Sequence, residues 1–506
     1  MRAGRDRRPG GRVPRAFLAA TALVAATASP AAAFPATASP VTASQAIAGG
    51  KPAAIAWTPC PDRPVTECGT LTRPIDPERP ELGTFPMALA RHRATDPARR
   101  VGVLVVNPGG PGQSGVDFAS GARWYFSPEV LARFDVVGFD PRGVGDSQPV
   151  RCSVELQFGG PGTHPTDRTG FERLREHNRL LREDCARHSG PIIDHVSTEE
   201  VVGDVDALRQ ALGEDRISYY GLSYGTVIGQ RYAERHGDRV RAMLLDSVVD
   251  RGVDAREHVA ASARAAADVL ARWLRWNERT ASSPLHGRDA GALWDELMAS
   301  AARGELADPD DPTRRITPHD LSGNLTASAY LPDWEGFSAW VLALRDGAPA
   351  ARAASRAAGG DPSLFATAFQ AITCADLGFR VRSHAEYAAL TRLENRISPR
   401  TAGSLRGNTA MTGCLGVPDT RTPQRPGAMR TAVPTLLLNS GHDPSTPHEW
   451  AVAVRRQQPR STVLVTYEGD GHGVYDRSDC TRRVGDDYLL SLSLPSDGTT
   501  CPAVDE

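Results

Sequence analysis

The residue type that this chain of 506 residues lacks most clearly is lysine. Lys51 is the only lysine among 58 basic residues, and all the others are arginine. It lies in an amino-terminal region of Ala, Thr, Ser and Pro without hydrophobic periodicity, so it is a poor base for a nucleophilic serine. A nucleophilic serine in this sequence would therefore need histidine as its base.

Metal-binding spacings are missing as well. No two cysteines have the Cys-x-x-Cys spacing of zinc or redox sites. His448-Glu449 is followed by Val452 at the position where a His-Glu-x-x-His motif needs its second histidine. We therefore expect no metal site and no cofactor.

Long hydrophobic runs are absent, since no stretch reaches the ~18 uninterrupted apolar residues of a membrane-spanning helix. We expect no stable membrane insertion. Residues 1–33 instead have the pattern of an export signal, with six arginines before the apolar run 16–26 and a small-residue cleavage site at Ala31-Ala32-Ala33. The sequence predicts a secreted, extracellular protein cleaved near Ala33, with a flexible leader or pro-segment over residues 34–56.

Excess positive charge is also lacking. The formal net charge is −2, and it becomes −7 once the six Arg and one Asp of residues 1–33 are removed. This balance argues against a nucleic-acid partner. We expect a monomer.

Eight cysteines fit an exported protein, because disulfides persist in oxidising compartments. Eight cysteines allow 105 pairings. Sequential pairing keeps every loop local, and we predict it: Cys60–Cys68, Cys152–Cys185, Cys374–Cys414 and Cys480–Cys501.

Buried strands alternate with helical segments in two parts of the chain. The continuous apolar run at 101–106 is typical of a parallel strand buried on both faces, and further strand-forming segments lie at 134–139, 433–439 and 461–467. Between them, residues 253–405 are Ala-rich with helical periodicity and contain no such run. We predict an α/β protein whose mostly parallel, doubly wound sheet is interrupted by a mainly helical cap. The predicted divisions are core 57–252, cap 253–405, and core 406–506 carrying an acid and a histidine.

The segment Ile217–Gly225 contains the central motif, Gly221-Leu-Ser223-Tyr-Gly225. A β-forming run precedes it and a helix-compatible segment follows, which is the strand–turn–helix context of a nucleophile elbow. We predict Ser223 as a nucleophile.

The base and its orienting acid should follow the serine, in the order acid then histidine, each after a strand. Asp443 follows the strand at 433–439 and His472 follows the strand at 461–467, so we predict Asp443 as the acid and His472 as the base. Asp246 is a rival acid and His442 a rival base. Thr446 is placed to hydrogen-bond the Asp443 carboxylate.

A developing oxyanion needs two backbone N–H donors. Tyr224 follows the nucleophile at a helix start, and the glycine-rich loop after the strand at 101–106 offers Gly109, with Gly110 as its neighbour. The same loop contains Gly110-x-Gly112-x-x-Gly115, with Asp140 after the next strand, which is a dinucleotide-binding pattern. That alternative leaves Ser223, Asp443 and His472 unexplained.

These motifs resemble a known family. The loop at 107–112, the Asp140-Pro-Arg-Gly-Val-Gly-Asp-Ser147 segment, the serine motif and Gly471-His472-Gly473 are similar to those of the secreted tripeptidyl aminopeptidases of actinomycetes. These are relatives of prolyl aminopeptidases within the α/β-hydrolase superfamily. The resemblance implies an α/β-hydrolase fold and a serine exopeptidase that releases tripeptides, or short amino-terminal units, from peptides with a free amino terminus.

An aminopeptidase also needs carboxylates that hold the substrate ammonium group. Asp376, first, and Glu335 are our candidates, with Asp333 as a further one. An exported carboxylesterase or lipase-like hydrolase on the same triad is the alternative function. A binding protein on a degenerate hydrolase fold is a third reading, and the intact triad argues against it.

Overall fold

The computed structural model describes residues 54–61, 63, 65–309, 311, 313–347, 363–377, 379–418 and 426–504. The predicted export signal, 1–33, and nearly all of the predicted leader, 34–56, lie outside these residues. None of the helices in the described ranges has the length and apolar character needed to cross a bilayer.

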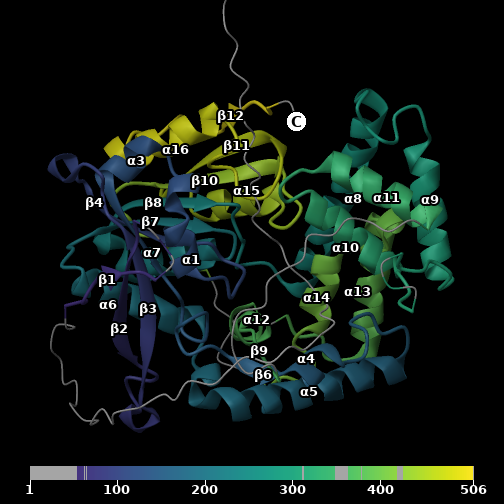
Figure 1. Cartoon of the computed structure of the whole chain (residues 1–506), viewed down its shortest axis with the longest axis horizontal. Coiled ribbons are helices and arrows are strands. Elements are labelled where there is room, and N and C mark those ends of the chain that lie inside the picture. Colours follow the sequence, from purple (N-terminus) through teal and green to yellow (C-terminus); the bar gives the residue numbers. More distant parts are fainter. Residues whose placement is uncertain are drawn as a thin grey trace, which may run out of the picture. The chain divides into compact units, whose positions relative to one another are not determined.

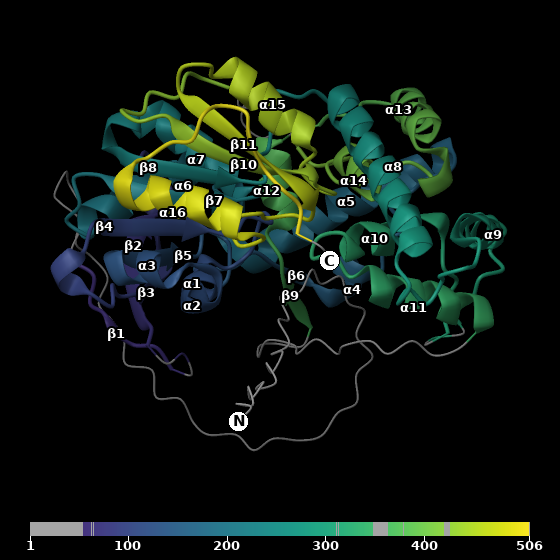
Figure 2. The ribbon, with the colours of Figure 1, turned by 90° about the horizontal axis from the view of Figure 1, so that it is seen from above.

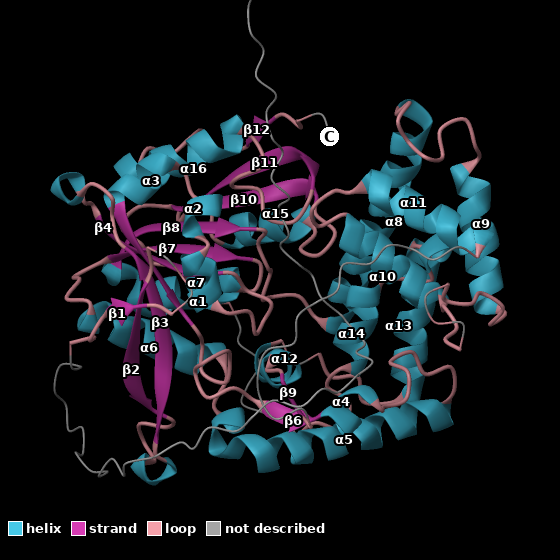
Figure 3. Ribbon diagram, viewed as in Figure 1, coloured by secondary structure: helices cyan, strands magenta, loops and turns pink. Residues whose placement is uncertain are grey.

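One large sheet organises the described chain (Figures 1 and 3). Its strand order is β1-β2-β3-β5-β4-β7-β8-β10-β11-β12. The pairs β1–β2, β2–β3 and β3–β5 are antiparallel, whereas every neighbouring pair from β5 to β12 is parallel. Their bounds are β1 (Thr58–Pro59), β2 (Glu67–Pro74), β3 (Thr84–His92), β4 (Gly102–Asn107), β5 (Phe134–Phe139), β7 (Ile217–Leu222), β8 (Val240–Asp246), β10 (Thr435–His442), β11 (Thr462–Asp470) and β12 (Thr499–Cys501).

Both faces of this sheet are buried, as the apolar runs predict. Along β4, Val103 and Val105 belong to one apolar cluster, whereas Leu104 and Val106 belong to a second cluster on the other face. Period-two alternation sends successive side chains to opposite faces, so a run without polar residues serves two cores. Figure 2 shows α15 and α16 on opposite sides of β10 and β11.

Helices cover the two faces. The first face carries α6 (Thr198–Ala211), α7 (Gly225–His236) and α15 (His448–Gln457). The second face carries α1 (Gly115–Ser120), α2 (Ala122–Tyr125), α3 (Pro128–Arg133) and α16 (Asp479–Ser491). A capping box begins α6, in which Ser197 and Glu200 each bond the other's backbone N–H. The short 3₁₀ turns are η1 (Pro80–Leu82), η2 (Pro97–Arg99), η3 (Gly190–Asp194), η4 (Gly237–Arg239) and η5 (Pro399–Thr401).

Seven helices lie between β8 and β10 in the described chain. They are α8 (Ala255–Arg279), α9 (Ala290–Ala302), α10 (Pro318–Ser328), α11 (Trp334–Asp346), α12 (Phe369–Asp376), α13 (His384–Ile397) and α14 (Leu405–Thr412). The first four surround the buried indoles of Trp273 and Trp294, which form an apolar cluster separate from the sheet. The described strands of this region are limited to β9 (Leu364–Ala366), which pairs with β6 (Arg151–Ser153).

The main element that was not predicted from the sequence is the long helix α5 (Arg168–Ser189), which follows α4 (Val154–Phe158). Its Phe171 and Leu174 pack with Tyr387 and Met411 of the helical insertion. The chain before residue 253 thus contributes to the packing of the insertion. The division into core 57–252, cap 253–405 and core 406–506 stays a proposal, and below we use "cap" for residues 253–405.

Four disulfides join the cysteines of the described chain, which has no free cysteine. They are the four pairs that sequential pairing predicts: Cys60–Cys68, Cys152–Cys185, Cys374–Cys414 and Cys480–Cys501. Cys152–Cys185 ties β6 to α5, and Cys374–Cys414 lies between α12 and the end of α14.

The disulfides generate a stability prediction. Replacing both Cys152 and Cys185 by alanine should lower the free energy of unfolding by about 3–4 kcal/mol, because a cross-link between residues 33 apart removes much unfolded-chain entropy. The matched control replaces Cys60 and Cys68, which are 8 residues apart, and should lose about 1 kcal/mol less. Urea unfolding followed by fluorescence measures both; a larger loss in the control would contradict the loop-length argument.

Candidate active site

Ser223 lies in the turn between β7 and α7. Its φ is 57°, in the left-handed region that residues other than glycine rarely occupy. The Ser223 N–H donates to the carbonyl of Asp246 on the adjacent strand at 2.9 Å, and its carbonyl accepts from Thr226 Oγ1 at 2.6 Å. These bonds hold the strained conformation that a nucleophile elbow requires.

The glycines of this turn are required by close backbone packing. A Cβ at Gly221 would lie 2.4 Å from the carbonyl oxygen of Gly225, and one at Gly225 would lie 2.5 Å from the carbonyl oxygen of Asn107. Both distances are far below van der Waals contact. The Gly-x-Ser-x-Gly spacing is therefore a steric condition for packing β7, α7 and the end of β4 together.

Asp443 and His472 come together after β10 and β11. Nδ1 of His472 lies 3.0 Å from each oxygen of the Asp443 carboxylate. Asp443 is 2% exposed, and burial alone would raise its pKa. The charge and hydrogen bond of His472, with the N–H groups of Thr446 and Ser445, outweigh burial and hold the pKa of Asp443 below its usual value. The carboxylate is thus kept ionised beside the imidazole.

Thr446 bonds Asp443 as the sequence led us to expect. Its Oγ1 donates to Asp443 Oδ2 at 2.9 Å, and its N–H donates to Oδ1 at 2.8 Å. The Ser445 N–H also donates to Oδ1 at 2.8 Å. The loop after β10 therefore binds the Asp443 carboxylate through its own N–H groups and fixes the orientation of that carboxylate toward His472.

Ser247, the residue after β8, joins the acid loop to the histidine loop. Its Oγ donates to Asp443 Oδ2 at 2.8 Å and accepts from the N–H of Gly473 at 2.7 Å. Its φ is also 57°. The sequence analysis missed Ser247; the available signal was its position directly after the strand that neighbours β7 and β10.

The rival acid Asp246 is hydrogen-bonded to the loop that carries His472. Its carboxylate accepts from the N–H groups of Val474 and Tyr475 at 2.9 Å and from the hydroxyl of Tyr220 at 2.8 Å. Burial raises the pKa of Asp246 to about 6, against the opposing effect of those N–H donors. Asp246 thus binds the backbone of the residues that follow His472, whereas Asp443 is the carboxylate in contact with His472 Nδ1.

The histidine loop also contacts the elbow and the cap. A Cβ on Gly473 would lie 3.1 Å from Leu222 Cδ1, so the residues next to His472 and Ser223 approach each other. The His472 N–H donates to the carbonyl of Tyr330 at 2.9 Å, and the two rings lie edge to face with centroids 4.8 Å apart. No hydrogen bond joins Ser223 Oγ to His472, both of which are described; such bonds often tighten only when substrate is bound.

The glycine loop lies directly against the elbow, as the predicted oxyanion hole requires. A Cβ at Gly109 would lie 2.7 Å from the backbone nitrogen of Tyr224. The preference for Gly109 as donor needs correction, because its N–H already donates to Asn107 Oδ1 at 3.0 Å. The N–H groups of Gly110 and Tyr224 donate to no acceptor within the described chain, so they are the better-placed pair.

The predicted ammonium ligands differ in their burial and in their hydrogen-bond partners. Asp376 is 6% exposed, and its carboxylate accepts from Thr198 N–H at 2.9 Å, from Thr198 Oγ1 at 2.7 Å and from the hydroxyl of Tyr224. We therefore correct that assignment: Asp376 anchors the residue after Ser223 from inside the protein. Asp333 caps α11 by accepting from Gly336 N–H, whereas Glu335 is exposed in the first turn of that helix.

The remaining alternatives have other partners in the structure. His442 Nδ1 lies 2.7 Å from Asp268 of α8, so the rival base pairs with the cap. Asp140, the acid of the dinucleotide pattern, is 1% exposed and accepts from Ser114 Oγ and the N–H of Asp146. Its carboxylate thus stabilises the loop itself.

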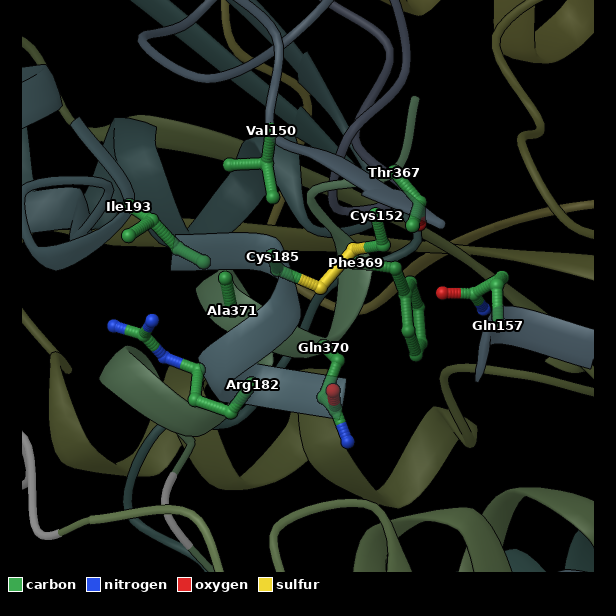
Figure 4. Close-up of a pocket in the computed structure, with 10 residues that line it drawn as sticks. All are labelled: Val150, Cys152, Gln157, Arg182, Cys185, Ile193, Thr367, Phe369, Gln370 and Ala371. Carbon is green, nitrogen blue, oxygen red and sulfur yellow. A yellow bond between two sulfur atoms is a disulfide. The ribbon is translucent and has the colours of Figure 1, made fainter. Parts of the chain in front are cut away.

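A small cavity of about 80 Å³ lies elsewhere, beside the Cys152–Cys185 disulfide. Figure 4 shows Arg182, Phe369 and Gln370 among its lining side chains. The Arg182 guanidinium donates to Asp194 at 2.5 Å. The lining includes no acid and none of the predicted triad, so this cavity is separate from the site at Ser223.

Comparison with known proteins agrees with this geometry. A family model described as "alpha/beta hydrolase fold" matches residues 102–478. The chain belongs to the α/β-hydrolase family.

Three relatives with named activities are similar to this chain over most of its length. The chain is 32% identical to the serine protease Hip1 of Mycobacterium tuberculosis over 88% of this chain and 91% of the relative. It is 30% identical to the tripeptidyl aminopeptidase of Streptomyces coelicolor over 90% and 87% of the two chains. It is 31% identical to carboxylesterase B of M. tuberculosis over 86% of each chain. Together with the fold, these relatives make the chain a serine hydrolase.

The role of Ser247 is open to test in this hydrolase. Ser247→Ala removes a donor to Asp443 and the acceptor of Gly473 N–H, so the two loops that carry Asp443 and His472 should loosen. We expect kcat to fall by about tenfold to a hundredfold, since a lost hydrogen bond to a charged group is worth ~1.5–3 kcal/mol. Ser189→Ala is the control, because Ser189 is buried and hydrogen-bonded to Arg151 away from this site. Equal activity in the two variants would contradict the assignment.

Proposed function

We propose that this protein is an exported serine exopeptidase that releases tripeptides, or short amino-terminal units, from peptides with a free amino terminus. The observation that carries the proposal is the Asp443–His472 contact at 3.0 Å beside a serine held at positive φ. The relatives named serine protease and tripeptidyl aminopeptidase support the choice of peptide substrates.

In the proposed mechanism, His472 accepts the proton of Ser223 Oγ while that oxygen attacks the scissile carbonyl. Asp443 orients the imidazole and stabilises its charged form. The N–H groups of Tyr224 and Gly110 bind the oxyanion, and donors of this kind are worth about 3–4 kcal/mol each in the transition state. His472 then protonates the leaving amine, the C–N bond breaks, and water clears the acyl-enzyme.

Recognition of a free amino terminus requires a carboxylate that can pair with the substrate ammonium group. Asp376 is bound internally and Asp333 caps α11, so Glu335 is the predicted acid that is exposed and has no capping role. We propose Glu335 as the ligand of the substrate ammonium group. The four disulfides support export, since such bonds persist in oxidising compartments. A monomer that needs no cofactor stays our expectation.

The alternative is an exported carboxylesterase on the same residues, which the relative named carboxylesterase B favours. A substrate panel separates the two functions: a tripeptidyl nitroanilide, its N-blocked form, an aminoacyl nitroanilide and a short-chain nitrophenyl ester. We expect the unblocked tripeptidyl substrate to be cleaved fastest. Ester cleavage without peptide cleavage would establish the esterase instead.

The nucleophile assignment has its own test. Ser223→Ala should lower kcat/KM by about 10⁴-fold or more, because triad members act as a unit. A phosphonate probe should label the wild-type protein on Ser223, as read by peptide mass spectrometry, and should not label the variant. Retained turnover in Ser223→Ala would rule out this mechanism. Ser189→Ala again provides the matched control for handling and folding.

A further inference from the structure

Arg406 of α14 lies close to the proposed catalytic histidine. Its guanidinium carbon is 5.4 Å from the centroid of the Tyr330 ring, and that ring lies edge to face on the ring of His472. The carbonyl of Tyr330 accepts from His472 N–H at 2.9 Å and from the guanidinium of Arg477 at 2.6 Å. Tyr330 is thus fixed to the histidine loop, and Arg406 stacks on it.

The charge of Arg406 has no acidic partner in the described chain. The nearby Arg400 is paired with Asp295 at 2.8 Å, yet no carboxylate of the described residues lies within 4.0 Å of the Arg406 guanidinium. Burial lowers its pKa, and the more distant charge of Asp443 opposes that effect. A half-buried cation without a counter-ion is costly unless a ligand supplies one.

Two neighbouring groups sharpen this imbalance. The Tyr330 hydroxyl is buried without a hydrogen-bond partner in the described chain. Burial, and then the charge of Arg406, lower the pKa of the neighbouring His258 to about 4, so His258 is neutral at pH 7 and adds no second cation. A guanidinium fork and a hydroxyl donor without acceptors are the groups that bind a carboxylate.

The position of Arg406 identifies which part of a substrate it faces. His472 delivers its proton to the leaving nitrogen, so the leaving fragment lies beside that ring. The His472 and Tyr330 ring centroids are 4.8 Å apart, and the Arg406 guanidinium is 5.4 Å from the Tyr330 centroid. The guanidinium therefore lies no farther from the His472 ring than about three residues of extended chain, at ~3.4 Å each. The carboxylate of a leaving fragment of one to three residues can therefore reach the guanidinium.

Resting on the proposed peptidase function, we propose that Arg406 binds the carboxyl-terminal carboxylate of a short leaving fragment, so that the preferred substrates are peptides with only one to three residues after the scissile bond. The Tyr330 hydroxyl donates a second hydrogen bond to the same carboxylate.

The test compares tetra-alanine with its carboxyl-terminal amide, which differ only in the charge of the leaving fragment. Wild-type kcat/KM should favour the acid by about tenfold to a hundredfold. In Arg406→Gln this ratio should fall to about one, and Arg406→Lys should keep part of it because the charge remains. Tyr330→Phe should reduce the ratio several-fold.

Arg345→Gln is the matched control, since Arg345 is an exposed cap arginine paired with Asp346, and its ratio should equal that of the wild type. Circular dichroism and labelling of Ser223 by a phosphonate show that each variant is folded. A wild-type enzyme that cleaves both peptides equally, or an Arg406→Gln variant that still prefers the acid, overturns the role of Arg406 and leaves the peptidase function standing. Wild-type protein that cleaves no peptide but cleaves a nitrophenyl ester overturns the proposed function, and this inference with it.

Discussion

A buried negative charge on Asp443 is the constraint on which the candidate site depends. An ionised carboxylate out of water is unfavourable unless donors surround it. Here the donors come from three chain segments: the loop after β10, Ser247 after β8, and His472 after β11. Because the same donors that stabilise the charge belong to the loops that must meet, satisfying the carboxylate also sets the geometry of the base.

The parallel sheet brings these loops together because the strands that they follow are neighbours. The strands β4, β7, β8, β10 and β11 are neighbours in the sheet, so their carboxyl ends lie along one edge. The glycine loop, the elbow, Ser247, Asp443 and His472 follow them in turn. Close approach of backbone at Gly109 and Gly225 then locks the first two of these segments against each other.

Local rules predicted much of this arrangement and failed where contacts are distant. The elbow at Ser223, the capping box at Ser197 and the apolar strands each have a signature within a few residues. Asp376 illustrates the failure, because its partners Thr198 and Tyr224 are more than 150 residues away and nothing nearby indicates burial. Gly109 was predicted because a glycine lets the backbone approach the substrate closely, while the bond from its N–H to Asn107 depends on a side-chain rotamer. The helix α5 is rich in charged residues and has only a narrow apolar stripe. That stripe packs against residues distant in the sequence, so the sequence near α5 does not indicate its burial.

The disulfide pairing has a consequence for how the chain acquires its covalent structure. Each disulfide joins two cysteines that are consecutive in the sequence, and the widest separation is 40 residues. A chain that enters an oxidising compartment from its amino terminus therefore presents each cysteine to its correct partner before a competing thiol follows. Oxidation can proceed in order of emergence, with no bond that has to be broken and reshuffled by an isomerase.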